Sequence, residues 1–188
     1  MGLTRSTDHL IAKMTSATVS ISDASLGRND GESNMNYHLA QINIGRLLAP
    51  IHDPKIAEFV AQLEPINALA DNSPGFVWRL QSSSGNATDI AYNEDPSVMV
   101  NMSVWESLEA LRDYAYKSNH MKVLRDRAKW FEKMDKPIYC LWWIPAGHIP
   151  TVAEGRERLE HYQLYGATPY SFWFSQHFPQ PADESVPA

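Results

Sequence analysis

The chain has 188 residues, with 22 acidic against 16 basic side chains and a net charge of −6 at pH 7. This length suits one domain, and the acidic balance disfavours nucleic acid and anionic membrane surfaces as partners. The single cysteine, Cys140, has no partner for an internal disulfide, and its apolar neighbours predict a buried strand residue in a reducing compartment. No apolar run approaches the ~20 residues of a membrane span, and no secretory pattern is evident, so we expect a cytoplasmic protein.

The two ends of the chain lack the patterning of a packed domain. Residues 1–35 are rich in Ser, Thr, Asp, Asn and Gly, and their apolar residues stand singly. Such a segment buries too little surface to offset the entropy of ordering, so we predict a disordered leader over 1–35. The proline-rich residues 179–188 are predicted to form a disordered tail. The folded domain is therefore expected over 36–178.

The domain is expected to open with a strand and a helix. Apolar and polar residues alternate over 38–46, which predicts the first strand. Asp53 and Pro54 then supply an N-cap and a first-turn proline, so a helix is expected to begin there. Pro65 is expected to break or kink this helix.

The middle of the chain predicts two strands and then a divided helix. The strands are expected over 76–81 and 97–105, with a long polar connection between them. A helical stretch over 106–134 is expected to divide near Ser118 and Asn119, because both residues favour caps over helix interiors. Its second piece should bury a stripe made of Met121, Leu124, Ala128 and Phe131.

The last part of the domain predicts another strand and helix. A strand is expected over 137–144, and Thr151 with Glu154 forms a capping-box pattern for a helix that runs to about Tyr165. A short final strand is possible over 172–174. The first six elements give the split β-α-β order, which predicts an α+β, ferredoxin-like antiparallel sheet with helices on one face.

The sheet face opposite these helices is expected to mix polar and aromatic residues. It would carry Leu39, Gln41, Asn43, Arg79, Gln81, Met99, Asn101, Ser103, Trp105 and one of Trp142 or Trp143. Such a mixture is more typical of a ligand pocket or an interface than of a wet surface. If two copies meet across a dyad, each closes the other into a barrel with internal cavities. A subunit interface without a ligand is the alternative, because aromatic residues are also enriched where subunits meet.

Several segments together resemble a known family. They are Tyr37–Asn43, Pro65–Asp71, Ser73–Gln81, Val104–Leu111, Ser118–His120 and Leu141–His148. They resemble a bacterial and fungal family catalogued as a domain of unknown function, in the dimeric α+β barrel superfamily that includes the antibiotic-biosynthesis monooxygenases. The resemblance covers nearly all of residues 37–174, and it implies a dimeric α/β barrel and a homodimer.

What the resemblance implies about function is broader. Relatives in the superfamily include cofactor-independent monooxygenases acting on polyketide aromatics, haem-degrading oxygenases, haem-dependent chlorite dismutases, and small isomerases or dehydratases. The haem-degrading branch uses an asparagine on the first strand, and a tryptophan and a histidine on the middle helix. Asn43 and His120 lie in the corresponding regions, but Tyr114 or Tyr116 stands near the tryptophan position and the spacing to His120 is shorter. A fold alone does not choose among these activities.

Three residues are predicted to be catalytic: His120, Asn43 and Tyr116. His120 could act as an acid, a base or an axial ligand, and it shares a helix face with Tyr116 if the helix continues. A cap or a semi-buried structural histidine is an equal alternative. The amides of Asn43 and Asn101 could hold a carbonyl or an oxyanion, or could pair across the strands.

Substrate contacts are predicted for Asn101, Arg79, Trp105, Trp143 and His148. Arg79 could neutralise an anionic substrate, although an arginine in such a strand is more often exposed or ion-paired. Tryptophans more often pack in the core, and His148 precedes a helix start, where a structural role is the alternative. No metal site is predicted, because no two histidines have ligand spacing and the cysteines of a zinc site are absent.

These residues predict a homodimeric enzyme that acts on a small apolar or aromatic metabolite, in secondary metabolism. The expected chemistry is monooxygenase-like, or a proton transfer of the isomerase or cyclase kind, without an organic cofactor. The alternative is a protein that binds haem or another hydrophobic ligand without turnover. Hydrolase, kinase and nicotinamide-dependent functions lack support, because their motifs are absent.

Overall fold

The computed structural model describes residues 37–117 and 125–182. Within them, one antiparallel sheet has the strand order β2-β3-β1-β4. Its strands are β1 (Tyr37–Arg46), β2 (Phe76–Arg79), β3 (Val98–Trp105) and β4 (Tyr139–Pro145). The helices are α2 (Ala57–Asp71), α3 (Leu108–Lys117) and α5 (Val152–Tyr165), and η1 (Pro54–Ile56) and η2 (Arg127–Lys129) are short 3-10 turns. The predicted α+β antiparallel fold is confirmed, whereas the predicted leader over 1–35 lies outside the described residues.

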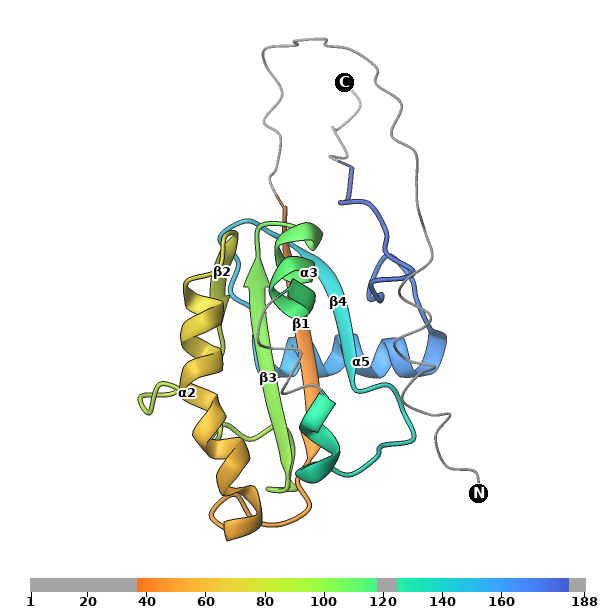
Figure 1. Cartoon of the computed structure of the whole chain (residues 1–188). Helices are drawn as coiled ribbons and strands as arrows, with labels where there is room; N and C mark the ends of the chain where they lie inside the picture. Colours follow the sequence, from red (N-terminus) through yellow and green to blue (C-terminus); the bar gives the residue numbers. More distant parts are fainter. Residues whose placement is uncertain (1–36, 118–124, 183–188) are drawn as a thin grey trace, which may run out of the picture. The chain divides into compact units, whose positions relative to one another are not determined.

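The two helices of the split β-α-β motif share one face of the sheet, as predicted (Figure 1). Trp105 of β3 stacks on Tyr114 of α3 with ring centroids 4.9 Å apart. The Tyr114 hydroxyl in turn donates to the Ile66 carbonyl oxygen of α2 at 3.5 Å. These contacts tie both helices to the face that carries Trp105, which we name the α2/α3 face.

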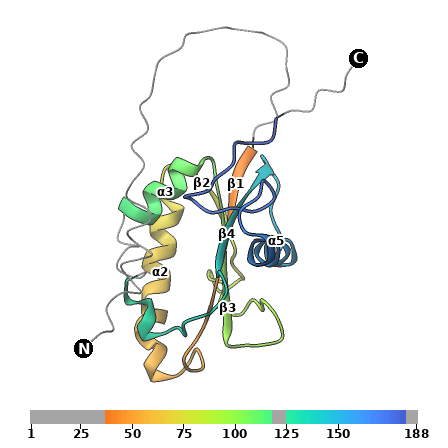
Figure 2. The ribbon, with the colours of Figure 1, turned by 90° about the vertical axis from the view of Figure 1, so that its right-hand side faces the viewer.

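The third helix, α5, lies on the opposite face (Figure 2). A Cβ added to Gly155 of α5 would stand 2.9 Å from Ile42 Cδ1, so helix and sheet approach each other closely here. Leu159 of the same helix is fully buried in the main core. That core also takes the apolar strand residues of this face: Ala40, Ile42, Ile44, Val98, Val100, Met102, Val104, Cys140, Trp142 and Ile144.

The mixed polar and aromatic residues lie on the α2/α3 face, so their predicted place opposite the helices is wrong. Trp105 is fully buried beneath α3, and Leu39 pairs with it across β1 and β3. Strand alternation predicts which residues share a face, but it does not say which face the helices cover. The face opposite α2 and α3 is apolar and is covered by α5 of the same chain. A partner copy is therefore not needed to cover either face, and the homodimer stays a prediction that rests on the family resemblance.

Local boundaries differ from expectation at several points. Helix α2 does not break at Pro65 but runs through it, with the proline exposed on the outer side. The predicted division near Ser118 and Asn119, and the stripe residues Met121 and Leu124, lie outside the described residues. The helical stretch ends by η2, where Ala128 is exposed and not buried. Phe172 makes an isolated antiparallel bridge with Leu141 in place of a strand. The predicted helix start at Thr151 is confirmed, because its hydroxyl accepts from the Glu154 amide at 3.1 Å. The capping box is not closed, since the Glu154 carboxylate contacts Trp142 Nε1 and His148 Nε2 instead.

Candidate functional site

Four polar side chains cross the centre of the α2/α3 face. They come from the two central strands, where Gln41 pairs with Ser103 and Asn43 pairs with Asn101. Because residues two apart on a strand point to the same side, all four lie on one surface. We name these residues, Gln41, Asn43, Asn101 and Ser103, the amide row.

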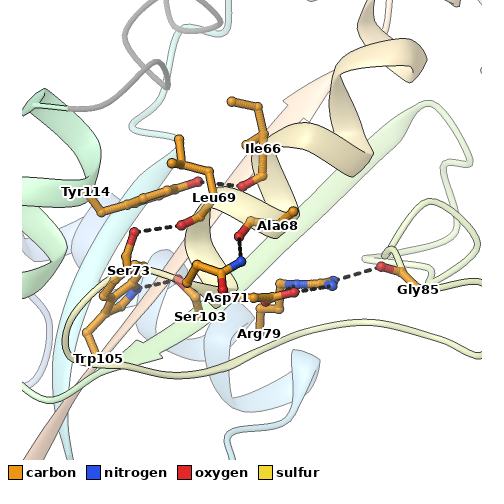
Figure 3. Close-up of polar contacts among 11 residues, drawn as sticks. Ile66, Ala68, Leu69, Asp71, Ser73, Arg79, Gly85, Ser103, Trp105 and Tyr114 are labelled. Carbon is orange, nitrogen blue, oxygen red and sulfur yellow. Dashed lines mark hydrogen bonds and ion pairs between the residues drawn. The ribbon is translucent and has the colours of Figure 1, made fainter.

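Gln41 is the centre of the hydrogen bonding in the amide row. Its Nε2 donates to Asn101 Oδ1 at 2.8 Å and to Ser103 Oγ at 2.9 Å. Ser103 Oγ also accepts from the indole nitrogen of Trp105 at 2.8 Å (Figure 3). Gln41 is only 5% exposed, and its Oε1 is buried with no hydrogen-bond partner among the described residues. An unpaired buried acceptor costs roughly 1–3 kcal/mol, so its presence calls for an explanation.

Exposure changes steadily along the amide row. Gln41 and Ser103 are buried, Asn43 is half-buried and Asn101 is exposed. Solvent therefore reaches the row at Asn101, while its other end lies inside the domain. The Asn43 side chain makes no hydrogen bond to another described residue. The row thus offers amide donors and acceptors to a molecule that arrives from solvent.

Aromatic side chains flank the amide row on two sides. Trp105 lies between Tyr114 and Phe76, with the Phe76 ring edge-on at 5.3 Å between centroids. On the other side, Tyr139 pairs with Asn43 across β1 and β4 and meets Trp173 edge-on at 4.7 Å. Burial raises the pKa of Tyr139 well above its usual value. Its phenol is therefore neutral at physiological pH, and it would act as a hydrogen-bond donor and not as a base.

A comparison with known families matches residues 38–187 to a family model described as a domain of unknown function, DUF3291. The chain belongs to the DUF3291 family. The predicted membership of a domain-of-unknown-function family is therefore confirmed. No curated protein matches this DUF3291 chain.

Solved structures similar to this DUF3291 chain are distant from it. NE2512, a protein of unknown function from Nitrosomonas europaea, is 14% identical, with 63% of this chain and 99% of that chain covered and a TM-score of 0.42. SnoaB, a cofactor-independent oxygenase from Streptomyces nogalater, is 16% identical, with 60% and 95% covered and a TM-score of 0.38. Similarity this low supports no transfer of activity, so function has to be argued from the site.

The predicted substrate residue Arg79 is engaged by its own chain. Its Nε and Nη2 donate to the two carboxylate oxygens of Asp71 at 2.8 and 3.1 Å, and its Nη1 donates to the Gly85 carbonyl at 2.9 Å (Figure 3). All three contacts hold the end of α2 and the loop after β2 against the strand. Arg79 borders the amide row, but its hydrogen bonds are used within the chain.

The other predicted residues of the DUF3291 chain divide between the two faces. Trp143 lies at the edge strand, where its indole donates to the Phe178 carbonyl at 2.8 Å. Tyr116 of α3 is 37% exposed and meets Phe174 edge-on at 5.9 Å. His148 instead contacts Glu154 of α5 at 2.8 Å, on the side of the sheet away from the amide row. His120 lies outside the described residues.

Sequence reasoning placed Gln41 on the mixed face but did not include it among the site residues. Strand alternation places Gln41 on the same face as Asn43, and this signal could have identified it. That its Oε1 lacks a partner depends on which residues of β3 lie opposite, and the strand register is known only from the structure. Within the described part of the chain, no group of three or more His, Cys, Asp or Glu residues could hold a metal ion. No helix there is long and apolar enough to cross a membrane.

Proposed function

We propose that this DUF3291 protein binds a small planar molecule against the amide row and transforms it by proton transfer or oxygenation, without an organic cofactor. The observation that carries the proposal is the buried, unpaired Oε1 of Gln41. Native proteins leave few buried polar atoms unpaired, and those that persist are often explained by a catalytic role or by a bound water or ion. We attribute this one to a bound ligand.

The polar atoms of the row specify the chemistry of that molecule. Gln41 Oε1 can only accept a hydrogen bond, so it requires a ligand donor such as a phenolic or enolic hydroxyl. The side-chain amides of Asn43 and Asn101 can donate to a carbonyl oxygen. The aromatic rings of Trp105 and Tyr139 favour an apolar, planar body between them. A ring that carries a hydroxyl and a carbonyl on one edge satisfies these demands together.

The same atoms suit a reaction that develops negative charge on oxygen. Removal of a proton from a carbon next to the ligand carbonyl gives an enolate, and the donors of Asn43 and Asn101 would stabilise it. His120 is our proposed base for this step. If O₂ then adds to the carbanion, the electron pair of the carbanion forms the new C–O bond. Protonation of the terminal oxygen gives a hydroperoxide. When the reacting carbon was a CH₂ group, the hydroperoxide still carries one hydrogen and can lose water to give a carbonyl. One O₂ then yields one carbonyl and one water.

The test uses a panel of phenolic and 1,3-dicarbonyl aromatic compounds. Deuterium exchange at the acidic carbon, followed by NMR, reports proton transfer, and an oxygen electrode reports oxygenation. We expect one or both activities in the wild type and a loss of roughly 10²-fold or more in Asn43→Ala, the usual scale for one oxyanion donor. Gln41→Leu should weaken binding, whereas Gln81→Leu, a matched change at an exposed glutamine, should not.

A different result would replace the proposal. If no compound exchanges or consumes oxygen, and added haemin gives a Soret shift that His120→Ala abolishes, the protein binds haem or a similar hydrophobic ligand instead. The homodimer, the cytoplasmic location and a role in secondary metabolism remain part of the proposal. Sedimentation velocity at micromolar concentration tests the first of these, and a monomer there would remove it.

A further inference from the structure

The guanidinium of Arg127 lies over the α2/α3 face next to the amide row. Its Nη2 is 3.4 Å from the position that a Cβ on Gly45 would occupy. On β1 the side-chain positions of Gln41, Asn43 and Gly45 point to the same side of the sheet, about 7 Å apart from one to the next. Arg127 therefore stands above the first position beyond Asn43.

Glycine at position 45 makes room for this arrangement. Phe131 Cδ1 is only 2.6 Å from the hypothetical Cβ of Gly45, so any larger residue would displace the ring. The amide of Phe131 donates to the Arg127 carbonyl at 2.9 Å, which fixes the turn that carries both side chains. The Arg127 guanidinium carbon lies 5.6 Å from the centre of the Phe131 ring. The strand, the turn and the ring together hold this cation over the sheet.

The charge of Arg127 is not matched by an acidic side chain in the described part of the protein. Arg46 pairs with Asp95 and Glu132, and Arg79 pairs with Asp71, but no described carboxylate forms an ion pair with Arg127. The side chain is half-buried, and burial lowers the pKa of its guanidinium. A cation–π contact offsets only part of the cost of removing a guanidinium from water.

We infer that Arg127 is an anion-binding residue of this site, and that the ligand carries a carboxylate or another ionised oxygen acid beside the edge that meets the amide row. The inference rests on the proposed function. Arginine presents two parallel N–H donors that match a carboxylate, which makes it suited to fixing such a group. The complete ligand would then place its acid on Arg127 and its hydroxyl and carbonyl on Gln41, Asn43 and Asn101.

The test compares two probes of the same shape by isothermal titration calorimetry. 4-Hydroxybenzoate carries a carboxylate across the ring from a free phenolic hydroxyl, and 4-hydroxybenzamide replaces that carboxylate with a neutral amide. We expect the wild type to bind 4-hydroxybenzoate at least about tenfold more tightly than 4-hydroxybenzamide, as a charge-assisted pair implies. Arg127→Gln should abolish this preference and leave 4-hydroxybenzamide affinity within about twofold. Arg125→Gln, a matched change at an exposed arginine two residues away, should keep the preference.

Two further variants separate the possible failures. Gln41→Leu should weaken both probes, because it removes the acceptor of their hydroxyl. If Gln41→Leu does so but Arg127→Gln retains the preference for 4-hydroxybenzoate, or Arg125→Gln loses it equally, the role of Arg127 is overturned and the amide row stands. If neither probe binds, or Gln41→Leu binds them as the wild type does, both proposals are overturned. Circular dichroism and thermal unfolding of each variant show whether it is folded. If Arg127→Gln does not fold, Arg127→Lys replaces it as a variant that keeps the positive charge but loses the two parallel N–H donors.

Discussion

At the scale of single residues, Gln41 is a polar side chain in a buried position that an apolar residue such as leucine could fill. The side chain is 95% buried, since only 5% is exposed, and one of its two polar atoms has no described partner. Replacing a buried polar group by an apolar group of similar shape is often neutral or stabilising, whereas removing a partner from a paired group is costly. A residue that binds a ligand at the expense of stability is a familiar compromise in functional sites.

We therefore predict that Gln41→Leu leaves the free energy of unfolding within about 1 kcal/mol of the wild type while it weakens ligand binding, because loss of the two hydrogen bonds from Nε2 offsets removal of the unpaired Oε1. Urea unfolding followed by tryptophan fluorescence measures the first effect. Ser103→Ala is the control, because it removes the acceptor of both Gln41 Nε2 and Trp105 Nε1. It should lower the free energy of unfolding by roughly 1–3 kcal/mol. A clear destabilisation by Gln41→Leu would contradict the view that its unpaired oxygen is a cost in the free protein.

Arg79 leads to the opposite prediction, because its contacts lie within the chain. Its side chain is 11% exposed, and that of Asp71 is 42% exposed, so solvent screens the pair only in part. We expect Arg79→Ala to lower the free energy of unfolding by about 1 kcal/mol and to leave probe affinity unchanged. Arg79→Lys should restore little, because an ammonium cannot reproduce the two-pronged contact. A tenfold loss of affinity without loss of stability would return Arg79 to the substrate residues.

Sequence reasoning predicted part of the candidate site. Asn43 and Asn101 were expected to share a face, because alternation along a strand fixes the side on which each residue lies. Arg127 was missed, since its position depends on the bare backbone at Gly45 and on the turn that carries Phe131. Contacts of this kind depend on how distant segments pack, and strand or helix periodicity carries no record of them.

At the scale of elements, the helices and strands followed from local signals more closely than their arrangement did. The proline and N-cap at the start of the first helix, and the Thr151 N-cap of α5, act through neighbouring backbone groups and are visible in the sequence. The side of the sheet on which α5 packs was not visible. Both faces carry large apolar residues, so their composition did not show which face would accept α2 and α3 and which would accept α5.

The packing of α5 depends on the small size of Gly155. A Cβ there would lie 2.9 Å from Ile42 Cδ1 and 3.0 Å from Met102 Cε, contacts that flexible side chains can relieve only by shifting. We predict that Gly155→Val lowers the free energy of unfolding by about 1–3 kcal/mol through overpacking. Ala153→Val is the control at an exposed position of the same helix. It lowers helix propensity, whereas Gly155→Val raises it, so a larger destabilisation at Gly155 can come only from packing. Equal effects of the two substitutions in urea unfolding would show that α5 does not pack through Gly155.

At the scale of the whole described domain, both faces of the sheet are covered by helices of the same chain (Figure 2). A sheet-on-sheet dimer would require α5 to leave the apolar core in which Leu159 is fully buried. If a homodimer forms, we therefore expect its contacts to lie outside the sheet faces.

The interior of the domain contains several tyrosine side chains, and their burial affects stability at alkaline pH. Burial raises the pKa of a set of phenols and of the one thiol: Tyr92, Tyr114, Tyr116, Tyr139, Tyr162 and Cys140. For Tyr92 the pKa rises to about 12, so its neutral form is favoured in the folded state. A raised folded-state pKa contributes stability that is complete below the unfolded value of about 10 and is lost as pH rises toward 12. We predict that the free energy of unfolding falls across this window, each buried phenol adding up to about 1.4 kcal/mol per pH unit to the slope and the 37% exposed Tyr116 adding less. Urea unfolding at several pH values should show a shallower fall for Tyr92→Phe, and a curve parallel to the wild type would contradict the assignment.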